Sequence, residues 1–455
     1  MTNPDASSAI GVARVRAARV LERVWVDHAF AAAVLDSELS DLDPRDAALA
    51  TELVYGVLRT ESFLEAELLE FARSGRLVDS APALAHLLMG AYTMAFLDRI
   101  PAFAAVSAAV AGVTAAIGKQ PGGFCNAVLR AYARKLETTG RPSPEKAALE
   151  SAPGWLRGAL RRSLGRKGAE QFLSARPDTD DRPGPVAPPL GIAVGDRTAR
   201  DSVLAKLAAA APEGTFVASA LSAHGIVARG VGSPSRLPGF EREWIVQEEG
   251  AQVIALACGA KPGDNVLDAC GGRGNKAWLL SHLVGDTGSV ILADKFPDKV
   301  ERWLARAPFP GRTTGVAIDW SVGTGGLARD RDLVLVDAPC SGIGTLRRRP
   351  EIARNRDGTE LAELAAQQIA ITRRAATLCK PGGRLVYAVC SVLAEECEQV
   401  VAALTAEGEG PRLTPLAFTG SEIAAIADAP EPTSFRLLPH RHGTDGYFVA
   451  QLRVE

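Results

Sequence analysis

The spacing of hydrophobic residues divides the chain into a helical first part and a later part in which strands and helices alternate. Over residues 13–134, apolar side chains recur three or four positions apart, as Val20 and Val24 do, which is the period of one buried helix face. A helix is predicted to begin at Asp43 and Pro44, because an aspartate cap followed by proline is a common helix start. The first part of the chain is therefore expected to be all-helical.

One segment of this part, Ile100–Gly118, contains no charged residue and has to be weighed as a membrane span. Most of its side chains are alanine, serine, threonine or glycine, and alanine favours membrane insertion far less than leucine or isoleucine does. The segment is expected to be a tightly packed helix with Pro101 in its first turn.

Beyond the helical part, turn residues and short apolar runs predict a different architecture. Residues 177–189 are rich in proline and aspartate and indicate a domain boundary, and Leu190–Arg242 reads as a small mixed α/β module. From Glu243 onward, helices are expected at 367–378 and 395–404. Strands are expected near residues 265, 290, 315, 334, 386, 414 and 448.

The most informative stretch is LVLVDAPCSGIGTLRRRP, which begins at Leu333. Its apolar start suits a buried strand, and the strand ends abruptly at Asp337. Ligands of open α/β sheets bind beyond the carboxyl ends of the strands, so Asp337 and Cys340 are expected to face a crevice. With Arg347–Arg349 nearby, this turn suggests an anionic substrate held beside a nucleophile.

A second cysteine follows a later strand. The sequence KPGGRLVYAVCS runs from Lys380 to Ser391 and predicts a glycine turn, a strand over Leu385–Val389 and then Cys390. If the two strands are neighbours in the sheet, Cys340 and Cys390 face the same crevice.

A third site is predicted where NVLDACGGRGNKAWLLSHLV reads as strand, glycine-rich turn and helix. Glycines let the backbone approach a ligand closely, and the helix that follows offers unpaired amides. Asp294 ends the next strand, where an acid accepts hydrogen bonds from ribose hydroxyls in nucleotide sites. Asp319 follows the strand expected over Thr314–Ile318.

Composition narrows the class of protein. With 455 residues, 47% of them hydrophobic and 23% charged, the chain describes a soluble globular protein of two or three domains. Seven irregularly spaced cysteines argue against a disulfide framework or a CxxC metal site and favour a reducing cytoplasm. The start, MTNPDASSAI, lacks the organisation of a secretion signal.

The net charge of −2 predicts no general affinity for nucleic acid, so basic residues matter only where they cluster. One local cluster precedes the proposed boundary and could line an RNA path or simply solvate a helix. Its members are Arg157, Arg161, Arg162, Arg166 and Lys167.

The sequences DAPCSGIGTLRRRPEI and LVYAVCSVLAEE resemble the two cysteine motifs of the Sun-type (RsmB-like) RNA cytosine-5 methyltransferases. The resemblance implies a class I, Rossmann-like, seven-stranded methyltransferase domain over 243–455. It also implies an all-α NusB-like RNA-binding domain over 1–150 and, between them, a basic helix with a small α/β subdomain over 151–242. RDAALATELVYGVLRT and GGFCNAVLRAYAR resemble the NusB-like domain. They offer candidates for phosphate contacts at Arg45, Arg59, Arg130 and Arg134.

The glycine turn is similar to the family's cofactor loop, which has the approximate form DxCAAPGGKT. This chain reads DACGGRGNKA over residues 268–277, and its least conservative departure is Arg273 in place of proline. Lys299 stands where the family usually carries arginine. The resemblance implies that S-adenosylmethionine is the cofactor. The implied cofactor-binding residues are Asp268, Cys270, Gly271, Gly272, Arg273, Gly274, Asn275, Lys276, Asp294, Asp319 and Asp337.

The same resemblance implies catalytic roles. Carbon 5 of cytosine becomes nucleophilic when a thiolate adds to carbon 6. By resemblance Cys390 attacks, Asp337 contacts the base and Cys340 assists the elimination that releases the product. The expected partner is RNA, in particular small-subunit (16S) ribosomal RNA, and the chain is expected to be a cytoplasmic monomer that uses neither a metal nor a membrane.

Two other functions stay open at this point. A DNA cytosine methyltransferase would use Cys340 as its nucleophile, although the second thiol at Cys390 and the helical first part argue against it. Alternatively, Arg273 and Asn275 would weaken cofactor binding and leave an RNA-binding ribosome-assembly factor.

Overall fold

The computed structural model describes residues 10–175 and 188–455, which form two compact units. The helical unit comprises the described residues of Met1–Arg161, Gly165–Pro188 and Leu346–Asp357. The sheet unit comprises Arg162–Leu164, Pro189–Thr345 and Gly358–Glu455. Residues 1–9 and 176–187 lie outside the described residues. They include most of the domain boundary predicted over 177–189.

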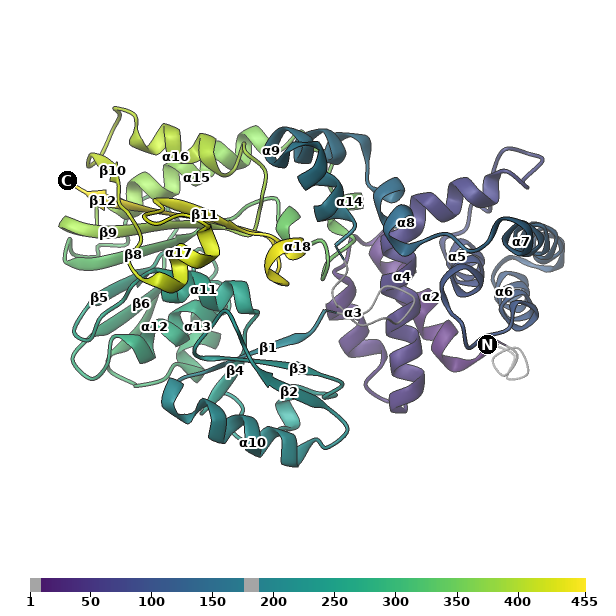
Figure 1. The fold of residues 1–455 in the computed structure, drawn as a ribbon, viewed down its shortest axis with the longest axis horizontal. Helices are drawn as coiled ribbons and strands as arrows, with labels where there is room; N and C mark the ends of the chain where they lie inside the picture. The colour runs from purple at the N-terminus through teal and green to yellow at the C-terminus, as the bar shows by residue number, and fades with distance from the viewer. Residues whose placement is uncertain (1–9, 176–187) are drawn as a thin grey trace. The chain divides into compact units, whose positions relative to one another are not determined.

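The helical unit confirms the all-helical prediction for the first part of the chain (Figure 1). Gly165 interrupts its last long helix with a φ of 72°. Its helices are α2 (Val12–Val26), α3 (Ala31–Glu38), α4 (Pro44–Leu69), α5 (Ala81–Phe96), α6 (Ala102–Ile117), α7 (Lys119–Thr139), α8 (Pro144–Ser151), α9 (Gly154–Leu173) and α14 (Ile352–Asn355).

Local sequence explains where two of these helices begin. The Asp43 carboxylate accepts hydrogen bonds from the backbone amides of Arg45 and Asp46, and Pro44 fills the first position of α4. The uncharged segment forms α6, which starts directly after Pro101. None of the helices within residues 10–175 and 188–455 is long and apolar enough to cross a membrane.

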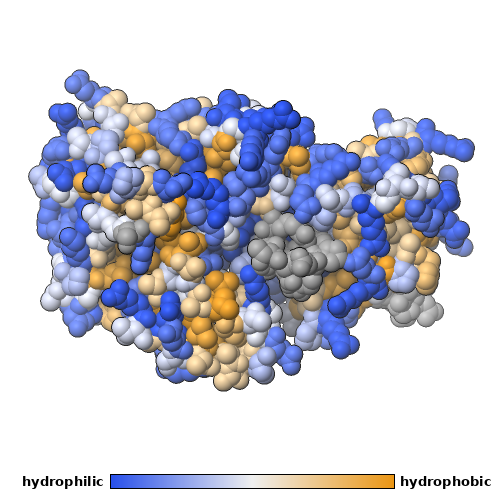
Figure 2. Space-filling view, in the orientation of Figure 1, coloured by the Kyte–Doolittle hydropathy of each residue, from blue (hydrophilic) through white to orange (hydrophobic). Residues whose placement is uncertain are grey.

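A small four-stranded antiparallel sheet opens the sheet unit. Its strands are β1 (Leu190–Val194), β2 (Thr215–Ala218), β3 (Gly225–Arg229) and β4 (Trp244–Val246), in the order β2-β3-β1-β4, and α10 (Arg200–Ala210) accompanies them. Trp244 is fully buried in the core beneath this sheet. Val217 on the edge strand β2 is 56% exposed. Hydrophobic residues gather at the surface in this part of the view in Figure 2.

The main sheet confirms all seven predicted strands, in the order β10-β12-β9-β8-β5-β6-β7 (Figure 1). An eighth strand that the sequence pattern did not predict, β11 (Ser434–Leu437), pairs with β12. The seven are β5 (Asn265–Asp268), β6 (Ser289–Asp294), β7 (Thr313–Ala317), β8 (Arg331–Asp337), β9 (Cys379–Val389), β10 (Leu413–Pro415) and β12 (Tyr447–Val454).

Helices flank this sheet. Those expected over 367–378 and 395–404 are α15 and α16, each displaced by a few residues. The helices of the sheet are α11 (Glu249–Ala257), α12 (Asn275–Leu283), α13 (Pro297–Arg306), α15 (Leu361–Ala376), α16 (Glu398–Thr405), α17 (Ser421–Ala427) and α18 (Pro439–His442).

The connections reverse direction at the centre of the sheet. From β5 the chain proceeds to β6 and β7 on one side, then returns to place β8 on the other side of β5. Such a reversal opens a crevice beyond the carboxyl ends of the two central strands. These ends are Asp268 of β5 and Asp337 of β8.

Replacement of Gly56 by alanine is predicted to destabilise the helical unit. A Cβ at Gly56 would overlap the ring of Tyr92, which is fully buried and donates a 2.5 Å hydrogen bond to Glu52. We expect Gly56→Ala to lower the free energy of unfolding by about 1–3 kcal/mol, measured by denaturant titration. Gly123→Ala is the control, because that exposed helical position is open and alanine there is expected to stabilise. Equal effects of the two substitutions would contradict this packing argument.

Candidate active site

Two neighbouring parallel strands carry the two cysteine turns. Asp337 at the end of β8 lies opposite Ala388 of β9, so both turns leave the same edge of the sheet. The Cys340 and Cys390 sulfur atoms are 3.4 Å apart. The prediction that the two cysteine turns are neighbours is confirmed by this distance.

Backbone hydrogen bonds lock the two turns together. The Gly344 amide donates to the Cys390 carbonyl at 3.0 Å, and the Gly344 carbonyl accepts from the Gly446 amide at 2.7 Å. A Cβ on Gly344 would overlap the carbonyl of Gly446, so no other residue fits between these two segments. Gly344 therefore fixes the position of one cysteine turn relative to the other.

A buried carboxylate that the sequence reasoning missed braces the first turn. Glu396 is fully buried and accepts hydrogen bonds from the Ser341 amide at 2.7 Å and the Ser341 hydroxyl at 2.5 Å. Gln368 donates to Glu396 at 3.1 Å and to the Pro339 carbonyl at 3.0 Å. The motif LVYAVCSVLAEE ends in Glu395 and Glu396. The sequence does not indicate that Glu396 is the buried one of the two.

The two thiols differ electrostatically. The hydrogen bond with Cys390, followed by burial, raises the pKa of Cys340 well above its usual value. Cys340 therefore keeps its proton at neutral pH and can donate it towards the Cys390 sulfur.

A buried cation stands beside the thiols. The Lys276 ammonium donates to an Asp337 carboxylate oxygen at 2.6 Å. Burial lowers the pKa of Lys276, but the charges of Asp337, Asp268 and Cys390 outweigh it, so the net shift is upward. Lys276 therefore stays protonated beside Asp337.

Asp268, the last residue of β5, is a buried carboxylate without hydrogen-bond partners among the described residues. It is 1% exposed, and neither carboxylate oxygen has a hydrogen-bond partner in the part of the chain that the structure describes. Burial, then the charge of Asp337, raises the pKa of Asp268 to about 7, while Lys276 opposes the shift. Buried acceptors without partners are costly, so they mark a place that suits a ligand with donor groups.

A cavity of about 520 Å³ lies beyond these strand ends, within the size range of small-molecule sites. Its lining includes Cys270, Gly272, Asp294, Lys299, Asp319 and Asp337 from the predicted set. The remaining predicted residues, with both sulfur atoms, lie outside this lining: Asp268, Gly271, Arg273, Gly274, Asn275, Lys276, Cys340 and Cys390.

The acids of this cavity are held by nearby donors. Asp294 accepts from the Gly272 amide at 2.9 Å, and the Lys299 ammonium stands 3.4 Å from its other oxygen. Hydrogen bonds from Ser321, together with Lys295, lower the pKa of Asp319 to about 2. Both carboxylates are therefore presented as acceptors beside a partly apolar cavity.

The glycine turn is shaped by steric demands. Gly274 has a φ of 80° and caps α12, and a Cβ there would overlap the Trp303 ring. Gly271 also has no room for a side chain, because Leu292 packs against it. The close approach of this turn to the sheet thus depends on glycine.

Two of the departures from the family loop, Arg273 and Asn275, lie outside the cavity lining. Asn275 donates to the Val246 carbonyl at 2.9 Å and accepts from the Arg306 guanidinium at 2.7 Å. Arg306 also donates to the Arg273 carbonyl, and the Arg273 side chain is exposed. The Asn275 side chain and the Arg273 carbonyl thus connect the turn to β4 and α13.

The predicted arginines have different surroundings. Arg347 is 8% exposed, the Arg349 guanidinium lies 5.6 Å from the Phe30 ring centre, and both belong to the helical unit. Arg59 donates to the Arg347 carbonyl at 2.7 Å, and its Nε and Nη1 atoms are buried, so its candidate role as a surface phosphate contact is not supported. The exposed candidates are Arg45, Arg130, Arg134, Arg161, Arg162, Arg166 and Lys167.

Two of the exposed arginines are engaged in ion pairs. Arg162 pairs with Glu395 at 2.8 Å and Arg166 with Glu170 at 3.2 Å. Among the described residues, no group of three histidine, cysteine, aspartate or glutamate side chains is arranged to hold a metal ion.

Comparison with known proteins gives consistent results. Residues 254–453 match the family model described as 16S rRNA methyltransferase RsmB/F, and residues 12–134 match that of the NusB family. The chain is 30% identical to the "Probable ribosomal RNA small subunit methyltransferase B" of Bacillus subtilis, covering 92% of each chain. It is 29% identical to the "Ribosomal RNA small subunit methyltransferase B" of Pseudomonas syringae pv. tomato, covering 96% of each.

A solved structure shares the fold. The crystal structure of PH0851 superposes with a TM-score of 0.76 at 21% identity, covering 98% of this chain and 99% of that one.

Glu396→Gln is predicted to destabilise the sheet unit. The amide would lose the charge-assisted bonds from Ser341 and set its own donor against that of Gln368. We expect a loss of about 1.5–3 kcal/mol in the free energy of unfolding, measured in guanidinium. The neighbouring Glu395→Gln breaks only the partly exposed pair with Arg162 and should cost about 0–1 kcal/mol. A Glu396→Gln protein as stable as the control would refute the bracing role.

Proposed function

Because the chain belongs to the family of RsmB/F-type 16S ribosomal RNA methyltransferases, we propose that it methylates carbon 5 of a cytosine in small-subunit ribosomal RNA, with S-adenosylmethionine as methyl donor. The observation that carries the proposal is the 3.4 Å separation of two thiols at the ends of adjacent parallel strands. It is tested by transfer of labelled methyl to unmodified ribosomal RNA, followed by bisulfite mapping.

The difference between the thiols supports their assigned roles. Cys390 is the nucleophile in this proposal: its sulfur bonds to carbon 6, which makes carbon 5 nucleophilic towards the methyl group. The raised pKa of Cys340 makes that thiol the proton donor of the pair, 3.4 Å from the Cys390 sulfur, which leaves Cys390 as the attacking thiol in this proposal. Asp337 lines the cavity and is proposed to contact ring nitrogen 3 of the base.

Cys340 takes part in the second half of the reaction. After methyl transfer, the proton on carbon 5 must leave and the bond between sulfur and carbon 6 must break. Cys340 is proposed to assist this elimination: its thiol, 3.4 Å from the Cys390 sulfur, gives its own proton to the departing sulfur and then accepts the proton of carbon 5 as a thiolate.

The residues around the cavity fit the proposed cofactor, which supplies the methyl group. Asp294 and Asp319 offer acceptors for ribose hydroxyls and for the adenine, and the Gly272 backbone allows close approach. Asp268 lies outside this lining, but its two buried acceptors have no hydrogen-bond partner among the described residues, which suits a nearby ligand rich in donors. Neither Arg273 nor Asn275 lines the cavity, so weak cofactor binding is not favoured.

RNA binding is proposed to involve exposed basic residues of the NusB-like region, Arg45, Arg130 and Arg134. A single-stranded or splayed base is the expected target, because carbon 5 and carbon 6 must be reached. The free thiols suit a reducing cytoplasm, and we propose that the chain acts as a monomer.

A DNA-type enzyme would require Cys340 to attack. The raised pKa of Cys340 disfavours a thiolate at that position, which weighs against this alternative.

Single substitutions are predicted to separate the two thiols. Cys390→Ala should give neither methylated RNA nor a covalent adduct, because no thiolate reaches carbon 6. Cys340→Ala should form an adduct that survives denaturing electrophoresis and turns over slowly. Cys270→Ala is the control and should trap nothing. A stable adduct in Cys390→Ala with none in Cys340→Ala would move the nucleophile to Cys340.

Asp294→Ala is predicted to weaken cofactor binding. The substitution removes acceptors from the cavity and frees the Gly272 amide. We expect a loss of about 1.5–3 kcal/mol in binding free energy by calorimetry. Asp298→Ala, an exposed acid of α13 paired with Arg302, should leave the affinity unchanged. No binding heat from the folded wild-type chain at millimolar cofactor would instead favour the assembly-factor function.

A further inference from the structure

The two thiols of the proposed active site lie almost close enough to bond to each other. Their sulfur atoms are 3.4 Å apart, whereas the sulfur atoms of a disulfide are about 2.05 Å apart. The sulfur atoms must therefore approach by roughly 1.4 Å, the difference between these distances, which small torsions about the two Cα–Cβ bonds can supply. Both cysteines are free and partly exposed, so a small oxidant in solution can reach them.

The backbone of the sheet unit holds this pair of thiols together. Asp337 lies opposite Ala388 in the parallel pairing of β8 with β9, and the Gly344 amide donates to the Cys390 carbonyl at 3.0 Å. All of these residues belong to the sheet unit. Because the fold keeps the two sulfur atoms side by side, a bond between them forms in an intramolecular step of high effective concentration.

The two sulfur atoms are expected to react with an oxidant in a fixed order. The hydrogen bond with Cys390, followed by burial, raises the pKa of Cys340, so Cys340 keeps its proton at neutral pH. Peroxides react with thiolates rather than with thiols. Of this pair, Cys390 is therefore the sulfur that meets the oxidant first.

The other cysteines are poorer targets for oxidation. Cys270 lines the larger cavity, but burial, followed by the charge of nearby carboxylates, raises its pKa well above the usual value. Four further cysteines are fully buried, and burial raises their pKa values in the same way: Cys125, Cys258, Cys379 and Cys397.

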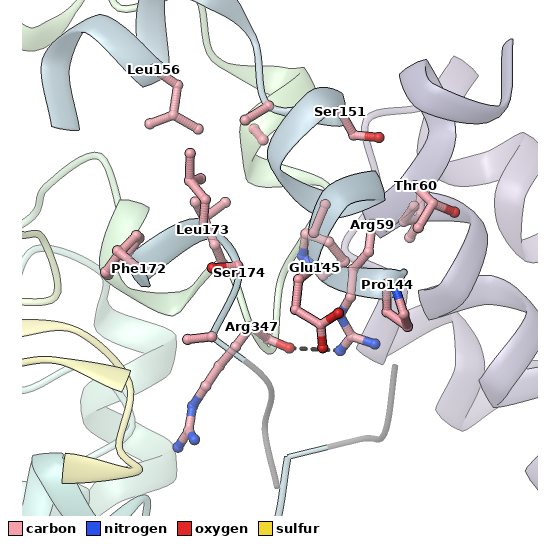
Figure 3. A pocket seen from close by; sticks show the side chains of 17 residues that line it. Arg59, Thr60, Pro144, Glu145, Ser151, Leu156, Phe172, Leu173, Ser174 and Arg347 are labelled. Atoms are coloured by element: carbon pink, nitrogen blue, oxygen red, sulfur yellow. Dashed lines mark hydrogen bonds between the residues drawn. The ribbon is translucent and has the colours of Figure 1, made fainter. Parts of the chain in front are cut away.

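The cavity of the helical unit offers no alternative thiol. It has a volume of about 120 Å³, and Leu156, Phe172 and Leu173 contribute apolar side chains to its lining (Figure 3). No cysteine is among the described residues that line it. Oxidation of a closely spaced pair is thus expected at the strand ends of the sheet unit.

We propose that Cys340 and Cys390 form a site of reversible oxidation, at which a peroxide converts the paired thiols into a disulfide and so stops methyl transfer. The inference rests on the proposed function, because both sulfur atoms have parts in that reaction. A reducing cytoplasm keeps the pair open, and the disulfide forms when peroxide accumulates. Thiol reductants reverse a disulfide but not a sulfinic or sulfonic acid, so the disulfide also protects Cys390 from permanent damage.

The oxidation proceeds in two steps. The Cys390 thiolate attacks one oxygen of hydrogen peroxide, the O–O bond breaks, hydroxide leaves and Cys390 becomes a sulfenic acid. The Cys340 sulfur then attacks the Cys390 sulfur, the S–S bond forms and the S–O bond breaks, and the departing oxygen leaves as water with the proton that Cys340 gives up. In total the two thiols lose two electrons and two protons, and the peroxide is reduced to two molecules of water.

The oxidised chain is expected to keep its cofactor site. Neither Cys340 nor Cys390 lines the larger cavity, whereas Asp294 and Asp319 do. Formation of the disulfide therefore removes the nucleophile and leaves the affinity for S-adenosylmethionine unchanged.

The test treats the full-length chain with hydrogen peroxide and then removes the peroxide with catalase. The protein is divided among methyl transfer to ribosomal RNA, calorimetry with S-adenosylmethionine, and peptide mass spectrometry. We expect a nearly complete loss of methyl transfer, an unchanged cofactor affinity, and a peptide pair cross-linked between Cys340 and Cys390. Dithiothreitol should restore methyl transfer and separate the two peptides.

Two variants sharpen this test. Cys340→Ser lacks the second step, so dimedone, which reacts with sulfenic acids, should label Cys390. Longer treatment of this variant should give a sulfinic acid that dithiothreitol does not reverse. Cys270→Ser is the matched control: it removes the other partly exposed thiol and should still give the cross-link.

Three results would overturn the proposal: no cross-link between Cys340 and Cys390 in the treated wild type, methyl transfer that persists in the cross-linked chain, or loss of the cross-link in Cys270→Ser. An untreated chain that transfers no methyl would instead refute the proposed function. The mass spectra decide whether the pair oxidises in that case too, because they do not depend on methyl transfer.

Discussion

The parallel pairing of β8 with β9 determines most of what the sheet unit presents at its carboxyl edge. Parallel strands in register end side by side, so the residues that follow Asp337 and Val389 emerge together. One slipped residue would turn every side chain to the opposite face. The closeness of Cys340 and Cys390 is thus a property of backbone register, which the Gly344 bond and the Glu396 carboxylate then refine locally.

Charge balance at this edge centres on a single lysine. Lys276 pairs with Asp337, while burial and then the charge of Asp337 raise the pKa of Asp268 against the opposing charge of Lys276. Since the buried negative groups outnumber this cation, the edge gains when a cationic or donor-rich ligand arrives. The electrostatics of the thiols and of the adjacent cavity are therefore linked through one side chain.

Much of this arrangement was predictable because strand ends are readable from apolar runs that stop abruptly. The apolar runs before Asp337 and Cys390 predicted two strand ends, and these strands are neighbours in the sheet. The helix start at Asp43 was predicted from its capping side chain. Glu396 was missed because a sequence does not distinguish an inward from an outward glutamate in consecutive positions. Strand β11 was missed because its sequence, SFRL, contains no run of consecutive apolar residues. Local patterns also cannot tell that residues 346–357 pack with helices encoded far earlier.

The late arrival of that segment bears on how the protein is made. Arg354 of α14 pairs with the buried carboxylate of Glu61 in α4, and the two residues are 293 apart in the chain. At translation rates of roughly 5–20 residues per second, the ribosome needs about 15 to 60 s to add Arg354 after Glu61. Until then the nascent helical unit lacks α14 and the partner of a buried carboxylate. Its final packing is thus completed only after much of the sheet unit has been synthesised.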